Sequence, residues 1–266
     1  MNKKGTSIKN ADYEGFIKNL LADGRISFSI DDMATLEVEQ ATLSKALYRL
    51  VQKGAIYPIR RGYYAVITPE YMRRGIVPET LFVDDLMGYL NREYYVSLLS
   101  AAALHGAGHQ QPMSFFITHN GNPLRNIVSD KHHINFINRK VWGKDVVMPM
   151  KTKSGYLHVS TPEATLFDLI ENQRILGLSR IYEVILELSE GVKTNRLRST
   201  AQLFSVATRQ RLGYILDTLE INATVIEKSL QKETLHPVYL SLMAEKKGEL
   251  DSKWQIIVND KISTDI

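Results

Sequence analysis

The sequence predicts an α+β protein with a small N-terminal domain, residues 1–75, and a larger mixed α/β domain, residues 76–266, whose C-terminal part is helical. Three observations predict this division. The small domain has the order helix, strand, helix, helix, strand, strand, which is that of a winged helix-turn-helix. Short apolar runs over about residues 114–159 have the composition of strands. Residues 163–230 carry apolar positions at helical spacing.

The small domain opens with a predicted helix over residues 11–21, for which Asn10 or Asp12 is the N-cap. Residues 25–29 alternate between polar and apolar side chains, so they predict a short strand that joins the sheet of this domain. Residues 30–36 predict the first helix of the helix-turn-helix.

The second helix of the helix-turn-helix is predicted to begin near Glu39 and to end at Lys53, where Gly54 supplies a left-handed C-terminal cap. Its buried stripe follows the i, i+3, i+4, i+7 spacing of one helix face. The stripe comprises Leu43, Ala46, Leu47, Leu50 and Val51. The opposite face comprises Ala41, Lys45, Tyr48 and Gln52, with Arg49 beside it.

Two apolar runs, residues 55–59 and 63–67, flank the turn Arg60-Arg61-Gly62 and predict a β-hairpin. Pro58 lacks a backbone N–H, so its strand is expected at the edge of the sheet. Arginines at an exposed hairpin tip reach a DNA backbone or a minor groove.

The helix face and the hairpin tip together predict a surface that binds double-stranded DNA, because cations, amides and hydroxyls contact phosphates and base edges. The predicted DNA-binding residues are Gln40, Ala41, Thr42, Ser44, Lys45, Tyr48, Arg49, Gln52, Arg60, Arg61 and Tyr63. Two alternatives remain. Small helical units with a hairpin also serve as protein-interaction modules, and a basic helix face is often simply solvated.

The charge distribution favours the DNA interpretation. The chain of 266 residues has a formal net charge of +4. Residues 1–75 contain 12 Lys and Arg against 8 Asp and Glu, whereas residues 76–266 contain 21 of each. The whole positive excess therefore belongs to the small domain, as expected for a DNA-binding head on a neutral body.

The composition excludes several other classes. The chain contains no cysteine, so it has no disulfide framework and no thiolate metal site, and a reducing compartment fits. The N-terminal residues 1–9 are polar and basic, and no long apolar segment follows them. We therefore expect a cytoplasmic protein without a signal peptide or membrane span.

The larger domain begins after a linker, residues 68–80, that Pro69, Gly75 and Pro78 punctuate. The predicted strands are residues 114–118, 134–137, 146–150 and 156–159. The predicted helices are 79–91, 94–104, one that Thr161 caps and Pro162 opens, 178–188, 194–204, 206–218 and 223–230. Residues 254–258 predict a C-terminal strand or arm.

Two stretches of the larger domain carry a family resemblance. They are the run from Tyr95 to Gly106, with Gln110-Gln111-Pro112 after it, and the run Ser160-Thr161-Pro162-Glu163-Ala164-Thr165-Leu166-Phe167-Asp168-Leu169. With the N-terminal domain, the chain resembles the AbiEi-type antitoxins of bacterial abortive-infection systems, which act in phage defence. These are the antitoxins of type IV toxin–antitoxin pairs. The resemblance extends from about residue 10 to residue 260.

The resemblance implies a transcriptional regulator that represses its own operon by binding inverted repeats in the promoter. It also implies that the larger domain counteracts a nucleotidyltransferase-type toxin without a stable complex. It assigns no neutralising residue, and a capped helix on a sheet suffices to explain residues 160–169.

The sequence gives little support to catalysis, and we predict no catalytic residue, no metal and no cofactor. No Gly-Ser pair of a nucleotidyltransferase occurs, and Asp84 and Asp85 are adjacent, so they do not share one strand face. Residues 121–125 lack the ending of a phosphate-binding loop. His105 and His109 are separated by helix-breaking glycines, and Ser100 beside His105 fits a helix contact better than a nucleophile.

Two functional alternatives stay open at this point. The larger domain could be an enzyme that acts on nucleotides or on the toxin, with the winged helix as its specificity module. It could also be a pure interaction protein that sequesters the toxin in a stoichiometric complex.

Overall fold

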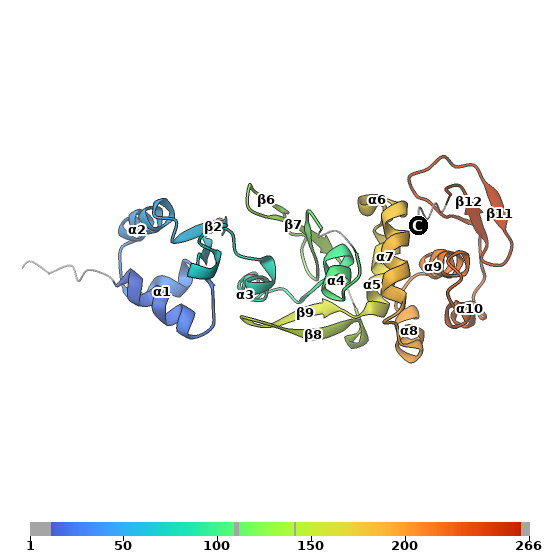
Figure 1. Cartoon of the computed structure of the whole chain (residues 1–266), viewed down its shortest axis with the longest axis horizontal. Helices are drawn as coiled ribbons and strands as arrows, with labels where there is room; N and C mark the ends of the chain where they lie inside the picture. The colour runs from blue at the N-terminus through green and yellow to red at the C-terminus, as the bar shows by residue number, and fades with distance from the viewer. Residues whose placement is uncertain (1–11, 109–111, 141, 262–266) are drawn as a thin grey trace, which may run out of the picture. The chain divides into compact units, whose positions relative to one another are not determined.

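The computed structural model describes residues 12–108, 112–140 and 142–261. Asn10 as a cap and the residues His109, Gln110 and Gln111 lie outside these ranges. The chain divides into two compact units (Figure 1). Among the described residues, the first unit contains 12–93, 127–132 and 151–157, and the second contains 94–108, 112–126, 133–140, 142–150 and 158–261. Across the described residues, each helix is too short or too polar to cross a bilayer.

Each element predicted for residues 11–67 is found within two residues of its predicted bounds. The elements are α1 (Tyr13–Ala22), β1 (Ser27–Ser29), η1 (Asp31–Leu36), α2 (Gln40–Gln52), β2 (Ile56–Arg60) and β3 (Tyr63–Val66). Element η1 is a 3-10 helix rather than an α-helix. The side chain of Asp12 caps α1 by accepting a hydrogen bond from the backbone N–H of Gly15 at 2.7 Å.

The three strands of this unit form an antiparallel sheet in the order β1-β3-β2. Pro58 lies on the edge strand β2, as predicted, and the register shifts between Pro58 and Arg60. Gly62 closes the hairpin with φ +78°, a conformation that side chains with a Cβ resist. Leu43 and Leu47 of α2 pack with Phe28 and Ile56 in the core, so the predicted apolar stripe of α2 does face inward.

The short elements η3 (Glu79–Leu81) and α3 (Val83–Tyr89) also belong to the first unit, which therefore extends beyond the predicted boundary at residue 75. Contacts to the small sheet explain this. Asp85 of α3 accepts a hydrogen bond from Ser27, and Tyr89 stacks on Tyr63 with ring centroids 5.1 Å apart. Part of the predicted linker between the domains is therefore packed structure.

A six-stranded sheet has the order β6-β7-β5-β4-β9-β8. Its strands are β4 (Tyr94–Val96), β5 (Phe115–His119), β6 (Ile127–Val128), β7 (His133–Asn138), β8 (Val147–Thr152) and β9 (Gly155–Ser160). The prediction of one helix over residues 94–104 is wrong at its start. Tyr94-Tyr95-Val96 is a buried central strand between β5 and β9, and the helix α4 (Leu98–Leu104) begins after it. Aromatic and β-branched side chains favour that strand.

The helices of the second unit surround α5 (Pro162–Glu171), whose residues from Glu163 to Ile170 are all buried. The prediction of Thr161 as its N-cap is confirmed, because the hydroxyl accepts a hydrogen bond from the N–H of Ala164 at 3.2 Å. The other helices are α6 (Gln173–Leu176), α7 (Leu178–Ser189), α8 (Thr194–Ala201), α9 (Val206–Thr218) and α10 (Thr224–Leu230).

A small sheet of β10 (Val238–Tyr239), β12 (Ile256–Val258) and β11 (Glu249–Asp251) follows the last helix. Trp254 fixes this region to α9, because its indole N–H donates to Asp217 at 2.7 Å and its ring lies against Gly213. A Cβ at Gly213 would come within 2.1 Å of that ring, so the contact requires glycine. Trp142 meets Tyr95 edge-on in the core of the same unit.

Candidate nucleic-acid interface

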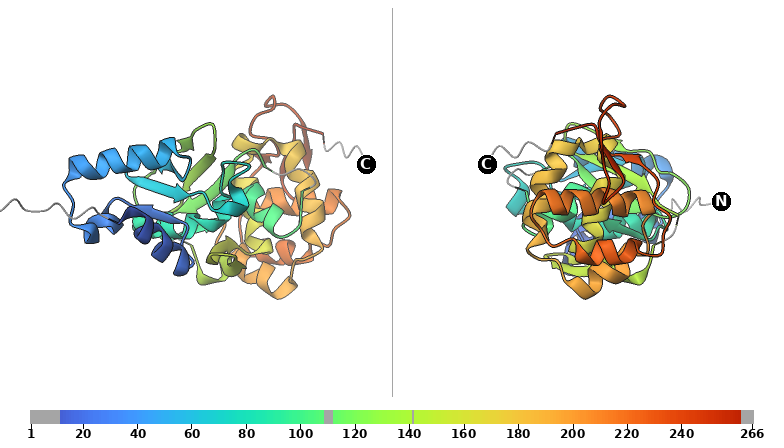
Figure 2. Two further views of the ribbon diagram at one scale, coloured as in Figure 1. Left: turned by 60° about the vertical axis from the view of Figure 1, so that its left-hand side comes forward. Right: turned by 90° about the vertical axis from the view of Figure 1, so that its right-hand side faces the viewer.

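The face of α2 opposite its apolar stripe is exposed along its whole length. Figure 2 (left) shows α2 at the outside of the first unit. The exposed residues of this face are Gln40, Ala41, Thr42, Ser44, Lys45, Tyr48, Arg49 and Gln52, all of them predicted DNA-binding residues. Tyr48 is 66% exposed, so its ring and hydroxyl are both accessible at the surface. We call this set the α2 face.

The α2 face presents donors and acceptors that are mostly free of local partners. Ser44 donates to the carbonyl of Gln40 at 2.8 Å, which uses its hydrogen but leaves its lone pairs available. Arg49 lies at one border, where it lines a pocket of about 320 Å³ with Asp12, Glu14 and Lys53. The carboxylates nearby lower the positive potential around Arg49, so Lys45 is the better placed cation for a phosphate.

The hairpin adds a cation at the turn between β2 and β3. Arg61 is exposed, whereas Arg60 is half-buried, with its Nη1 atom enclosed. The predicted pair of arginines at the tip therefore reduces to one exposed guanidinium and one that is partly covered. The exposed Arg73 and Arg74 follow in the chain after the short 3-10 helix η2 (Pro69–Tyr71).

The expectation that Tyr63 is available to DNA is wrong. Its side chain is 1% exposed, and its hydroxyl forms a hydrogen bond of 2.8 Å with Ser27 while its ring stacks on Tyr89. Burial raises the pKa of its phenol well above the ordinary value. The strand alternation places Tyr63 on the inner side of β3, so it belongs to the core.

Two of the described histidines, His132 and His105, contact other parts of the fold. His132 is buried in the first unit, where Nδ1 lies 2.7 Å from a carboxylate oxygen of Glu79 and Nε2 lies 2.8 Å from the hydroxyl of Tyr57. His105 lies 2.7 Å from the carbonyl of Ser160. Among the residues that the structure describes, no three His, Asp or Glu side chains gather as a metal site would require.

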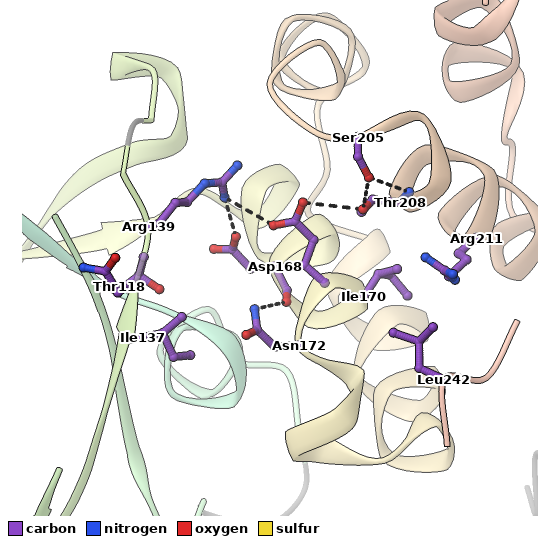
Figure 3. A pocket seen from close by; sticks show the side chains of 12 residues that line it. Thr118, Ile137, Arg139, Asp168, Ile170, Asn172, Ser205, Thr208, Arg211 and Leu242 are labelled. Atoms are coloured by element: carbon purple, nitrogen blue, oxygen red, sulfur yellow. Dashed lines mark hydrogen bonds and ion pairs between the residues drawn. The ribbon is translucent and has the colours of Figure 1, made fainter. Parts of the chain in front are cut away.

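Sequence reasoning missed a second polar cluster, which lies in the second unit (Figure 3). Arg139 follows β7 and donates to the buried Asp168 of α5 at 2.9 Å, and Glu171 lies 3.9 Å from the same nitrogen. Burial raises the pKa of Asp168 to about 7, although Arg139 opposes the shift. Residues 139 and 168 are far apart in sequence, so no local pattern signals this pair.

The comparison with protein families agrees with the sequence resemblance. Residues 95–218 match the family model of the AbiEi antitoxin C-terminal domain. Among solved structures, the protein RV2827C from Mycobacterium tuberculosis is similar with a TM-score of 0.67 and 15% identity, covering 90% of this chain and 88% of that one. That likeness shows the fold alone. The search of curated proteins found no match.

The matched segment starts at strand β4, includes the capped helix α5 and ends with α9. It therefore includes both sequence runs on which the resemblance depended, which lie within residues 95–112 and 160–169. By this match, residues 95–218 of the chain form an AbiEi antitoxin C-terminal domain.

Proposed function

We propose that this protein is an antitoxin and also a transcriptional autorepressor that binds operator DNA through its first unit, as a winged helix-turn-helix. The supporting observation is the α2 face, which is polar, cationic and exposed over the full length of a helix whose other side is core. A helix of 13 residues is long enough to enter a major groove. Arg61 at the hairpin turn is suited to a backbone phosphate beside that groove.

The DNA proposal is tested by electrophoretic mobility shift on the promoter of the operon that encodes this chain. The double variant Lys45→Glu/Tyr48→Ala should lose specific binding. Arg61→Ala should lower the affinity, and the slope of log affinity against log salt concentration should become shallower by about one, as expected for the loss of one phosphate contact. The matched control is Lys246→Glu/Lys247→Glu, which changes two exposed cations of the second unit. Undiminished binding by both first-unit variants would remove the proposal.

We infer further that the second unit counteracts a nucleotidyltransferase-type toxin without a lasting complex. The support is the family match over residues 95–218, which supports an antitoxin role. A toxin of this class, encoded next to the antitoxin, should arrest growth when expressed alone and should be tolerated when this chain is co-expressed. A double variant of Lys45 and Tyr48 should still protect the cells, because the α2 face is not part of the matched segment.

Affinity purification of the co-expressed pair distinguishes neutralisation without a complex from sequestration of the toxin. Recovery of a stoichiometric complex would indicate that the antitoxin sequesters the toxin, and would contradict neutralisation without a complex. Purified antitoxin incubated with labelled nucleotides and toxin should yield no modified product. A modified toxin would instead favour an enzymatic antitoxin.

A further inference from the structure

The second unit contains a polar cleft that neither the family match nor the DNA proposal explains. It has a volume of about 400 Å³, within the range of small-molecule sites. Its walls come from β7 and the residue after it, from the end of α5, from the start of α9 and from Leu242. Figure 3 shows the cleft with Arg139 and Asp168 at one side and Arg211 at the other.

One side of the cleft holds two carboxyl groups and a single cation. Arg139 lies 2.9 Å from Asp168 and 3.9 Å from Glu171, so a single guanidinium serves two carboxylates. Arg139 also has contacts other than the two carboxylates. Its Nη2 donates to the carbonyl of Leu203, and its guanidinium lies over the ring of Phe204 at 4.2 Å from the ring centroid. Glu171 otherwise has a hydroxyl contact from Thr208 at 3.5 Å.

The other side of the cleft carries an uncompensated cation. Arg211 is half-buried, and its Nε donates to the carbonyl of Tyr239 at 2.8 Å. Within the described part of the chain, Arg211 has no carboxylate within 4 Å. Burial lowers the pKa of its guanidinium, as expected for a cation that lacks such a partner. A half-buried charge without a counter-ion is costly unless a ligand supplies one.

The charges of the cleft define what it would accept. Above about pH 7, where Asp168 is ionised, two arginines and two carboxylates give a site that is neutral overall, so a ligand with a single net charge gains little. A ligand with a cation at one end and an anion at the other complements both sides. The lining by Ile137, Ile170 and Leu242 suits an apolar middle.

We propose that this cleft binds a small zwitterion, whose amino group contacts Glu171 beside the Arg139–Asp168 pair and whose carboxylate contacts Arg211. The matching compounds are an ω-amino acid or a short apolar peptide with free termini. This inference concerns the second unit and does not depend on DNA binding, so either one can fail without the other.

The test titrates the full chain, by calorimetry or NMR, with five compounds: ε-aminocaproate, leucyl-leucine, caproate, hexylamine and inorganic phosphate. The zwitterion ε-aminocaproate should bind saturably, and leucyl-leucine tests the peptide form. Caproate carries the carboxylate alone and hexylamine the amino group alone. Each should bind at least about tenfold more weakly than ε-aminocaproate, because each leaves one charged side of the cleft without its partner. Equal binding by caproate, by hexylamine or by inorganic phosphate would overturn the proposal.

Variants locate the site. Arg211→Gln and Glu171→Gln should each weaken ε-aminocaproate binding by about tenfold or more, and Arg211→Lys should restore part of the loss because it keeps the charge. The matched control is Arg198→Gln, which removes an exposed arginine of α8 outside the cleft. Circular dichroism below the unfolding temperature verifies that each variant is folded. No saturable binding to the wild-type chain, or unchanged affinity in both cleft variants, would refute the site.

Discussion

The helices α2 and α5 are of similar length, 13 and 10 residues, and they differ completely in how their polar side chains are used. In α2 the polar residues form one exposed face. In α5 the polar residues Glu163, Thr165 and Asp168 are buried and engaged with other segments of the chain. Glu163 accepts from the N–H of Lys193 at 2.6 Å, and Thr165 bonds with Ser160 at 2.7 Å.

This contrast distinguishes two kinds of polar residue. A polar residue held by internal partners is required for folding, so its substitution changes stability first. A polar residue without internal partners is open to external partners, so its substitution changes binding first. We therefore expect substitutions around α5 to change stability and substitutions on the α2 face to change the proposed DNA binding, and the following variants test this.

The largest effect is expected for Arg139→Ala. The variant removes the guanidinium that contacts Asp168 and the ring of Phe204, which should cost about 1.5–3 kcal/mol of unfolding free energy, because burial already favours the neutral form of Asp168 near pH 7. Urea denaturation of the second unit measures the loss. Where the protein is still folded, its affinity for operator DNA should be unchanged. A loss below about 1 kcal/mol would show that α5 does not depend on this ion pair.

The pH dependence of stability is a second test of the environment of α5. Burial raises the pKa of Asp168 from 3.8 to about 7, with Glu171 adding to the shift and Arg139 and Tyr95 opposing it. Between these two values the folded state holds the proton more strongly than the unfolded state. Stability should therefore decrease as the pH rises from about 4 to about 7.

The variant Asp168→Asn isolates this contribution, because asparagine does not titrate. Its unfolding free energy, measured by denaturation at several pH values, should fall less steeply over that window than the wild-type value. Identical slopes for the two proteins would mean that Asp168 titrates normally.

The helix caps give a smaller and more local contrast. Thr161 caps α5 with its hydroxyl, whereas Glu39 precedes α2 without a side-chain cap. Thr161→Ala should lower the stability by about 1 kcal/mol, and Glu39→Ser should raise it by up to about 1 kcal/mol, as thermal unfolding would measure. A loss of stability in Glu39→Ser would mean that Glu39 makes a stabilising contact of its own.

The smallest change in stability is expected on the α2 face. Lys45→Ala and Tyr48→Ala should each shift the unfolding free energy by less than about 0.5 kcal/mol, because both side chains are exposed. Each should nevertheless weaken operator binding measurably in a mobility-shift titration. A loss of stability comparable to that of Thr161→Ala would contradict the proposed difference between the two helices.

Much of the fold follows from local pattern. The α2 stripe, the hairpin with Gly62 at its turn and the cap at Thr161 are all determined by neighbouring residues, and each lies where the sequence predicts it. The run from Tyr94 was misassigned because its alanine-rich continuation suggested one longer helix. The strand at Tyr94–Val96 exists because β5 and β9, distant in sequence, pair with it.

The candidate sites divide in the same way. The α2 face was foreseeable because helical periodicity fixes which side chains share a surface. Tyr63 was misjudged because its partners Ser27 and Tyr89 lie 36 residues before it and in a later helix. The cleft was missed because Arg139, Asp168 and Arg211 come from three separate elements, and only tertiary structure brings them together.

The packing of Trp254 against Gly213 has a practical consequence. The sequence contains two tryptophans, Trp142 and Trp254, and both belong to the second unit. Indole fluorescence is therefore a reporter of that unit alone, whereas far-ultraviolet dichroism sums the helices of both units. Following one denaturation with both signals would reveal whether the antitoxin unit and the α2-bearing unit melt together or in sequence, without any added label.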